Sequence, residues 1–203
     1  SSRFPDPVLQ QVENFTSPTE TQNDAFKSVS KYFDRITRPE QILSSLPQAI
    51  QLMLDPADCG PATISMSQDV QGEVYDYPEV FFEEKIHTIR KIYPDPDQIK
   101  IAAEKIKNSN QPIIISGGGV LYAEAEKELS IFAKKHNIPV TSTVMGIGCM
   151  THDDPYYISA IGCLGEGSSN NLSKDTDLAL AVGTKLADFT TGSWTNFQNP
   201  DFN

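Results

Sequence analysis

The chain has 203 residues, of which 38% are hydrophobic and 21% are charged, so it has the composition of a globular protein with one large or two small domains. Its formal net charge of −11 repels the phosphates of nucleic acids and of anionic membranes. No apolar stretch approaches the roughly 20 residues that a membrane helix needs. We therefore expect no nucleic-acid and no membrane partner. Three cysteines without a CxxC pair favour reduced thiols, and hence the cytoplasm.

The first thirty residues are polar and contain several prolines, and they predict an arm or loop. A helix is expected next, with Thr37 as N-cap, Pro39 in the first turn and Glu40 reaching back in a capping box. Apolar residues at helical spacing continue it from Ile42 to Leu54. Pro47 should interrupt and kink this helix, because proline lacks the N–H that the helix needs there.

A short strand, Ala62–Met66, is predicted after a Cys-Gly-Pro turn. From residue 73 to residue 94 the hydrophobic period disappears, which predicts a linker. Four aromatic side chains in it are interpreted as packing anchors, since no basic residues flank them as a nucleic-acid surface would require: Tyr75, Tyr77, Phe81 and Phe82.

A second unit is predicted from Asp95, which should cap a helix that has Pro96 at its first position. The inward face of that helix is expected to consist of Ile99, Ala102, Ala103 and Ile106. A buried strand at Ile113–Ser116, a helix from about Tyr122 to His136, and strands at Val140–Val144 and Leu178–Val182 should follow. Residues 190–203 show no clear period.

Apolar strands that alternate with helices predict an α/β fold, a doubly wound parallel sheet covered on both faces. With only three clear strands, the sheet looks incomplete. The loops after the strands should share one edge of the sheet, where ligands of such folds bind. The residues expected to bind a cofactor at this edge are Gly117, Gly118, Gly119, Thr143, Met145, Gly183, Thr184 and Lys185.

The triple glycine, Gly117–Gly119, has two possible explanations. Glycines between a strand and a helix can cradle a phosphate, because the backbone approaches closely and the helix N-terminus favours an anion. They can equally form a tight turn that lets the helix pack closely on the sheet. The pattern is neither a GxGxxG fingerprint nor a P-loop. The three histidines have no metal-ligand spacing, and no residue is nominated as a catalytic base or nucleophile.

Two stretches of the chain resemble the thiamine-diphosphate enzymes of the acetolactate-synthase-like group. Residues 30–70 are similar to the end of their pyrimidine-binding domain, and residues 111–184 are similar to their central domain, which has a nucleotide-binding (NAD/FAD) type of fold. The motifs, whose order matches across most of the chain, are Arg35-Ile36, Pro39-Glu40-Gln41, Gly60-Pro61-Ala62, Gln68-Asp69-Val70, Gln111-Pro112-Ile113, Gly117-Gly118-Gly119-Val120, Ile138-Pro139-Val140, Thr143-Val144-Met145-Gly146, Gly162-x-x-Gly165 and Leu180-Ala181-Val182-Gly183-Thr184. The resemblance implies a pyrimidine-domain tail at residues 1–72, a linker at 73–94 and a truncated central, Rossmann-like domain at 95–203.

Within the family, three further stretches are similar to a branch that opens an inositol-derived cyclic dione by hydrolysing a C–C bond: Asp6–Glu13, Leu54–Pro61 and Tyr75–Pro78. The resemblance implies a small cyclic dione as substrate and a deoxy-glucuronic acid as product. It also implies thiamine diphosphate as electron sink and Mg²⁺ as anchor of the diphosphate. An acetolactate-synthase-like carboligase and a free-standing nucleotide-binding module stay open as alternatives.

In this family the glutamate that activates the cofactor would lie before Ser1, and the Gly-Asp-Gly…Asn metal motif would lie after Asn203. The chain by itself is therefore expected to be inactive and to bind neither thiamine diphosphate nor Mg²⁺. Lys185-Leu186 stands where FAD-binding members have an arginine and an aromatic residue, which argues against FAD. The resemblance also implies a homo-oligomer.

Overall fold

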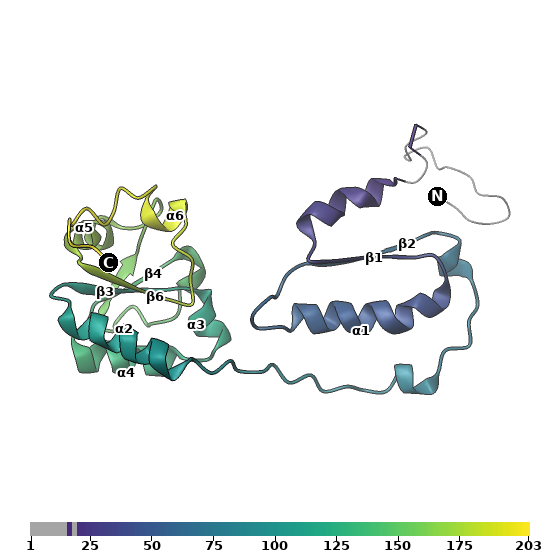
Figure 1. Ribbon diagram of the computed structural model, residues 1–203, viewed down its shortest axis with the longest axis horizontal. Helices are drawn as coiled ribbons and strands as arrows, with labels where there is room; N and C mark the ends of the chain where they lie inside the picture. Colours follow the sequence, from purple (N-terminus) through teal and green to yellow (C-terminus); the bar gives the residue numbers. More distant parts are fainter. Residues whose placement is uncertain (1–15, 18–19) are drawn as a thin grey trace. The chain divides into compact units, whose positions relative to one another are not determined.

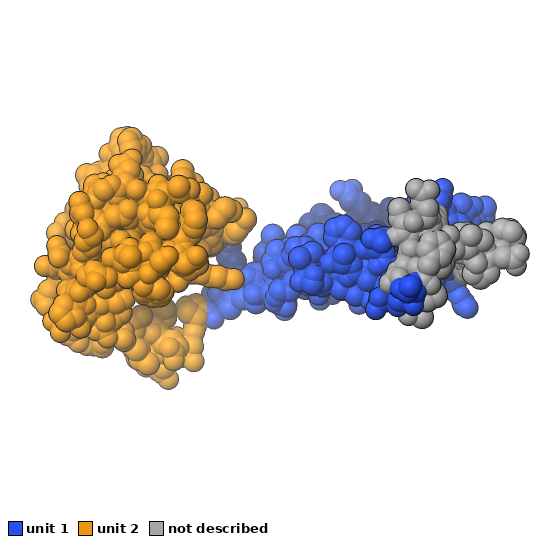
Figure 2. Space-filling model, turned by 90° about the horizontal axis from the view of Figure 1, so that it is seen from above, with its two compact units in different colours: residues 1–93 blue, residues 94–203 orange. Residues whose placement is uncertain are grey.

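The computed structural model describes residues 16–17 and 20–203, so the predicted motif Asp6–Glu13 and most of the predicted N-terminal arm lie outside the described residues. The chain forms two compact units, residues 1–93 and residues 94–203 (Figures 1 and 2). Each unit has its own parallel sheet.

The first unit is a β–α–β arrangement. Its strands β1 and β2 pair in parallel, from Tyr32 opposite Ala62 to Ile36 opposite Met66, and α1 connects them. The elements in chain order are η1 (Gln22–Val29), β1 (Tyr32–Ile36), η2 (Pro39–Gln41), α1 (Ile42–Met53), β2 (Ala62–Met66), η3 (Val70–Gly72) and η4 (Glu79–Phe81). Strand β2 has the predicted bounds, whereas β1 was not predicted. A charged pair at its centre hides its apolar pattern, and only pairing with β2 defines it.

The start of the first long helix differs from the prediction. Its N-cap is Arg38 and not Thr37, and the side chain that reaches back belongs to Gln41 and not to Glu40. Gln41 Oε1 accepts hydrogen bonds from the backbone N–H groups of Thr37 at 2.6 Å and Arg38 at 2.9 Å. The helix α1 also continues through Pro47 as one element, so the predicted interruption is wrong. The expected loop before β1 contains the 3₁₀ helix η1 instead.

The second unit is a four-stranded, wholly parallel sheet in the order β5-β4-β3-β6 (Figure 1). This confirms the predicted α/β fold with a parallel sheet. Its elements are α2 (Pro96–Asn108), β3 (Pro112–Ser116), α3 (Gly118–Tyr122), α4 (Glu126–His136), β4 (Val140–Ser142), η5 (Val144–Gly146), β5 (Tyr157–Ala160), α5 (Gly167–Asp175), β6 (Leu178–Val182) and α6 (Asp188–Thr191). Strand β5 was missed, because its four residues are too few to show a period of two.

The single helix predicted after β3 is two helices in the structure. In place of one helix from Tyr122 to His136, α3 begins directly at Gly118 and ends at Tyr122, and α4 follows after a break. At the break Glu124 has a left-handed backbone, with φ of 53°, which a continuous helix cannot contain. Further along, β4 ends at Ser142, and the predicted last strand residue Val144 belongs to a 3₁₀ turn.

Helix α2 has the predicted cap but lacks the predicted burial. The Asp95 carboxylate accepts a hydrogen bond from the N–H of Asp97 at 2.8 Å, and Pro96 occupies the first turn. No residue of α2 is fully buried, however, and Ile99 is 52% exposed. Only Ile106 of the predicted face packs against the core. The expected inward face is therefore largely wrong.

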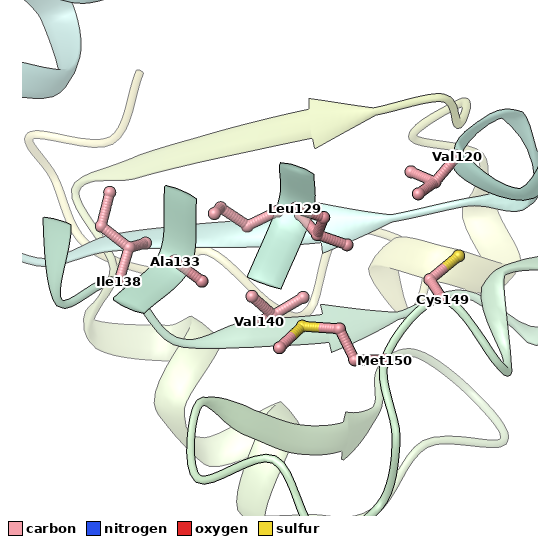
Figure 3. Close-up of a cluster of buried hydrophobic side chains, with 8 residues drawn as sticks. Val120, Leu129, Ala133, Ile138, Val140, Cys149 and Met150 are labelled. Atoms are coloured by element: carbon pink, nitrogen blue, oxygen red, sulfur yellow. The ribbon is translucent and has the colours of Figure 1, made fainter. Parts of the chain in front are cut away.

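The core of the second unit lies on both faces of the sheet, because β3 alternates its isoleucines. Ile114 joins the cluster below α4, whereas Ile113 and Ile115 belong to a cluster on the opposite face with Ile161 and Phe197. The cluster below α4 is shown in Figure 3 and consists of Ile114, Val120, Leu129, Ala133, Ile138, Val140, Cys149 and Met150. Both faces are covered, as predicted. No helix in the described part of the chain is long and apolar enough to cross a membrane.

Candidate functional site: a groove at the carboxyl edge of the sheet

The residues that follow β3, β4 and β6 surround a groove of about 660 Å³ in the second unit. Seven of the eight predicted site residues line it, and Gly117 does not. The parallel order places the connection from β3 to β4 on one side of β3 and β6 on the other. The chain therefore reverses its direction of winding between β3 and β6, which is where ligands of open α/β sheets bind.

The triple glycine packs directly against the loop after β6. The N–H groups of Gly117 and Gly119 donate to the carbonyl oxygens of Val182 and Gly183, both at 2.9 Å. A Cβ atom at Gly117 would lie 2.4 Å from the Gly183 oxygen, and one at Gly119 would lie 2.6 Å from the Gly183 Cα. Only glycine permits this approach of two backbones.

These contacts favour the tight-turn explanation of the triple glycine. Two of the three glycine N–H groups already donate hydrogen bonds within the protein. The helix α3 has only five residues, so the dipole of α3 is small. Gly118 faces the groove, where an added Cβ would lie 3.1 Å from the Met145 carbonyl oxygen. A ligand would therefore lie above the crossing of the backbones and not between them.

Thr143, which lines the groove, has an unsatisfied buried hydroxyl. Its N–H donates to the Ser116 oxygen at 2.9 Å, and its carbonyl accepts from the Gly146 N–H at 2.9 Å, so its backbone is held on both sides. The side chain is buried, and its hydroxyl oxygen has no hydrogen-bond partner among the described residues. A buried hydroxyl without a hydrogen-bond partner is costly, and this one belongs to a residue that lines the groove.

The charge of the groove comes from Lys185, which is the only charged residue among those that line it. Lys185 follows β6 and Thr143 follows β4, with β3 between them. Since neighbouring strands lie about 4.8 Å apart, the ends of β4 and β6 stand on the order of 10 Å from each other. The arrangement suits an extended ligand with an anionic end.

The rest of the lining is mostly apolar, and sequence reasoning missed it. It comprises Tyr122, Val144, Ile161, Leu164, Phe189 and Thr190. Tyr122 is 84% exposed and lies one helical turn after Gly119, so helical spacing from the triple glycine could have indicated it. Phe189 and Thr190 carry no such local signal.

One side of the groove depends on the partly buried amide of Asn170. Gly162 has φ of +99°, and a Cβ there would lie 2.2 Å from the Phe189 carbonyl oxygen. The Asn170 side chain accepts from the Gly162 N–H at 2.9 Å and donates to the Gly162 oxygen at 3.0 Å. Asn196 donates to the same Asn170 oxygen at 3.2 Å. These bonds hold the loop that carries Leu164.

The described residues provide little for catalysis. No group of three or more His, Cys, Asp or Glu side chains among them could hold a metal ion. Cys149, below the groove, is buried, and burial raises the pKa of its thiol, which keeps it protonated and unreactive. Its Sγ lies 3.4 Å from the Gly117 oxygen. The groove is thus equipped to bind a ligand more than to transform one.

Comparison with known proteins agrees with this arrangement. The family model of the thiamine pyrophosphate enzyme central domain matches residues 99–203, which contain the whole groove. Similar relatives match nearly the whole chain. Over 201 residues it is 46% identical to a protein of Clostridium tetani, 44% identical to one of Clostridium perfringens and 43% identical to one of Bacillus cereus strain AH820.

Each of these three relatives is named 3D-(3,5/4)-trihydroxycyclohexane-1,2-dione hydrolase. The alignments cover 99% of this chain but only 31–32% of each relative, so the chain spans about a third of their length. Because the family model matches more than half of the chain, and the matched residues lie within the unit that carries the groove, the chain belongs to the thiamine pyrophosphate enzyme family.

Proposed function

We propose that this chain is the central part of a hydrolase that opens trihydroxycyclohexane-1,2-dione by cleaving a C–C bond. The observation that supports this most is the identity of 43–46% over 99% of the chain to three relatives that carry this name. The similarity includes the first unit and the linker, which lie outside the match to the central domain. The expected product is a deoxy-glucuronic acid, and the expected role is in inositol breakdown.

The cofactor of the family does not fit the part of the chain that the structure describes. Its diphosphate needs a divalent cation with oxygen ligands. The groove is lined by no carboxylate, and the described residues contain no group able to hold a metal. We therefore propose that thiamine diphosphate and Mg²⁺ are held by other parts of a protein of the relatives' length.

We further propose that the groove binds a nucleotide that is not FAD. The seven predicted residues that line the groove would hold it, with Thr143 and Lys185 at opposite ends of the ligand. Leu186, which stands where FAD-binding members have an aromatic ring, packs against the Ile113 cluster and does not line the groove. The same groove supports the alternative that the chain is a binding module without catalysis.

Two properties of the whole protein complete the proposal. A cytoplasmic location is supported by three cysteines that are all free, two of them exposed. A homo-oligomer is proposed from the family resemblance.

The activity is tested with the full-length protein, loaded with thiamine diphosphate and Mg²⁺. We expect hydrolysis of the dione and no condensation of pyruvate. Condensation of pyruvate without hydrolysis of the dione would identify the carboligase instead.

The groove is tested by calorimetry of the 203-residue chain with ADP, NAD, FAD and thiamine diphosphate. We expect heat with ADP or NAD, and none with FAD or thiamine diphosphate. Thr143→Val keeps the shape and removes the hydroxyl, and should weaken binding by about tenfold, the effect of one hydrogen bond. Lys107→Met, on exposed α2, is the control for Lys185→Met. Absence of heat with all four compounds would exclude a nucleotide site.

A further inference from the structure

Part of the groove is built by two segments that come from the outermost strands of the sheet. Ile161 and Leu164 follow β5, whereas Phe189 lies in α6, after β6. The order β5-β4-β3-β6 places these two strands at opposite edges. The segments nevertheless meet, because the Cys163 N–H donates to the Phe189 carbonyl oxygen at 2.9 Å. We call residues 161–164 together with α6 the bridge, since they connect the two edges of the sheet.

The side-chain amide of Asn170, near the start of α5, holds the bridge from two sides. Its oxygen accepts a hydrogen bond from the Gly162 N–H at 2.9 Å, and its nitrogen donates to the Gly162 carbonyl oxygen at 3.0 Å. The same amide oxygen accepts from the Asn196 side chain at 3.2 Å. Asn196 is 5% exposed, and its backbone N–H donates at 3.2 Å to the carbonyl oxygen of Thr191, the last residue of α6. One side chain thus links the loop after β5 to the turn after α6.

The turn after α6 has a strained backbone. Gly192, Ser193 and Trp194 have φ of 58°, 55° and 61°, in the left-handed region that a bulky residue such as tryptophan rarely adopts. Backbones of this kind persist only where their surroundings hold them, and they are concentrated at ligand clamps and switches. Here the Ser193 N–H donates to the Asp188 carbonyl oxygen at 2.7 Å, and the Trp194 N–H donates to the Thr191 hydroxyl at 3.1 Å. The turn therefore depends on its contacts, and the hydrogen bond to the amide on α5 is one of them.

We propose that Asn170 is a positioning residue of the groove, and that it couples the two segments of the bridge so that they move together. Leu164 and Phe189 line the groove from these two segments, so a ligand that contacts either side chain shifts both segments. The shift reaches Trp194 through the strained turn. A ligand moves such an equilibrium only by favouring one arrangement, and contact with the two side chains provides this preference. The inference rests on the nucleotide site proposed above, but the coupling itself can be measured without a ligand.

Hydrogen exchange of single backbone N–H groups, followed by NMR, measures the coupling in the free 203-residue chain. The Cys163 N–H reports the loop after β5, and the Trp194 N–H reports the turn after α6. The Ile114 N–H, which donates to the Pro139 carbonyl oxygen at 2.9 Å, lies in β3 and reports unfolding of the whole unit. A local opening of the bridge speeds exchange at the first two groups and leaves the third unchanged.

Asn196→Ala is the most specific variant, because it cuts the bond between Asn170 and the turn and leaves both bonds to Gly162 in place. If the segments are coupled, exchange at both Cys163 and Trp194 should become about tenfold faster, which is the effect of one hydrogen bond. If they are independent, only the exchange at Trp194 changes.

Asn170→Ala removes the bonds on both sides and should speed exchange at the same two N–H groups by more than Asn196→Ala does. Asn171→Ala is the matched control. Asn171 is the next residue on α5, it is exposed, and its side chain accepts a hydrogen bond from Lys174. This variant should leave the exchange at both groups unchanged.

The effect of a ligand is measured by fluorescence, because Trp194 is the only tryptophan of the chain. Titration with ADP, or with NAD if ADP gives no heat, should shift the emission of the unchanged chain and of Asn171→Ala. For Asn170→Ala we expect about tenfold weaker binding and no shift of the emission. A role in stability alone would lower the midpoint of urea unfolding and leave both the affinity and the shift of the folded variant as they are.

Several outcomes would overturn the proposal. Faster exchange at Trp194 alone in Asn196→Ala would show two independently held segments, and an equal acceleration at Ile114 would show a general loss of stability. Unchanged affinity and an unchanged shift in Asn170→Ala would remove the positioning role. If Asn170→Ala does not fold, the same measurements on Asn196→Ala decide. If the unchanged chain gives neither heat nor a shift with ADP and NAD, the nucleotide site is wrong, and the exchange results decide the coupling by themselves.

Discussion

The two units share one building principle, two parallel strands joined through a helix, but they bury very different amounts of apolar side chain. Among the described residues, thirteen buried hydrophobic residues lie in the second unit and three in the first: Ile36, Ala49 and Val70. The second unit covers both faces of a four-stranded sheet, whereas the first has two paired strands.

The difference shows that a unit can form regular helices and strands without being stable by itself. Strands β1 and β2 are well paired over five residues, yet a two-stranded sheet without a further layer is marginal in water. In the second unit the alternating isoleucines of β3 give each face its own cluster. We infer that the second unit is the more stable of the two.

Separating the units should have the largest effect. Residues 94–203 are expected to unfold in one cooperative thermal transition, because the unit has a complete core. Residues 1–93 alone should show no cooperative transition, since their buried apolar surface cannot offset the conformational entropy. Circular dichroism on heating measures both. A sharp transition of the 1–93 fragment would contradict the comparison.

A smaller effect is expected from an added methyl group at the crossing of the two loops. Gly119→Ala should destabilise the second unit by about 3 kcal/mol, because its Cβ would meet the Gly183 Cα at 2.6 Å. Gly167→Ala is the control, since a Cβ there meets nothing within 4 Å. Urea unfolding of both variants gives the difference. Equal stability would show that the two loops can move apart.

The smallest effect should come from Asp177, which joins the end of α2 to the start of β6. Its carboxylate accepts hydrogen bonds from the Ser109 hydroxyl, from the Asn110 N–H at 2.7 Å and from the Gln111 N–H at 3.0 Å. Desolvation alone would raise its pKa, but these bonds outweigh it and lower the pKa from the ordinary 3.8. Asp177→Ala should cost about 2 kcal/mol at pH 7.

The pH dependence follows from the direction of that shift. A carboxyl group with a lowered pKa in the folded state contributes stability above its ordinary pKa and loses it as the pH falls through the folded value. The difference between the unchanged chain and Asp177→Ala should therefore be constant from pH 7 to about 5 and shrink below about 3.8. Asp175→Ala, exposed on the preceding helix end, should stay within about 0.5 kcal/mol of the unchanged chain. A difference that grows on acidification would refute this role.

The sequence predicted the elements whose signals are local. The Asp95-Pro96 start of α2, the isoleucine run of β3 and the glycine turn after it depend on caps, burial and backbone conformation within a few residues. Strands β1 and β5 were missed because neither has such a signal. Their residues become strands only where a neighbouring strand offers its hydrogen bonds.

The residues of the candidate groove also divide into those that the local sequence indicates and those that only the fold brings there. The glycines and Thr143 follow strands that the pattern identified, so their position at one edge could be predicted. Phe189 and Thr190 enter the groove because the chain folds back after β6, and Asn170 reaches the Gly162 loop from α5.

By itself, the sequence determined the fold class, the edge of the sheet at which a ligand would bind and the family to which the chain is similar. Only the tertiary structure decided that the triple glycine is a crossing of two backbones, that Thr143 keeps an unpartnered hydroxyl and that α2 remains largely exposed. The reason is that caps and periods act over a few residues. Close packing and hydrogen-bond satisfaction depend instead on atoms that are distant in the chain and meet only after folding.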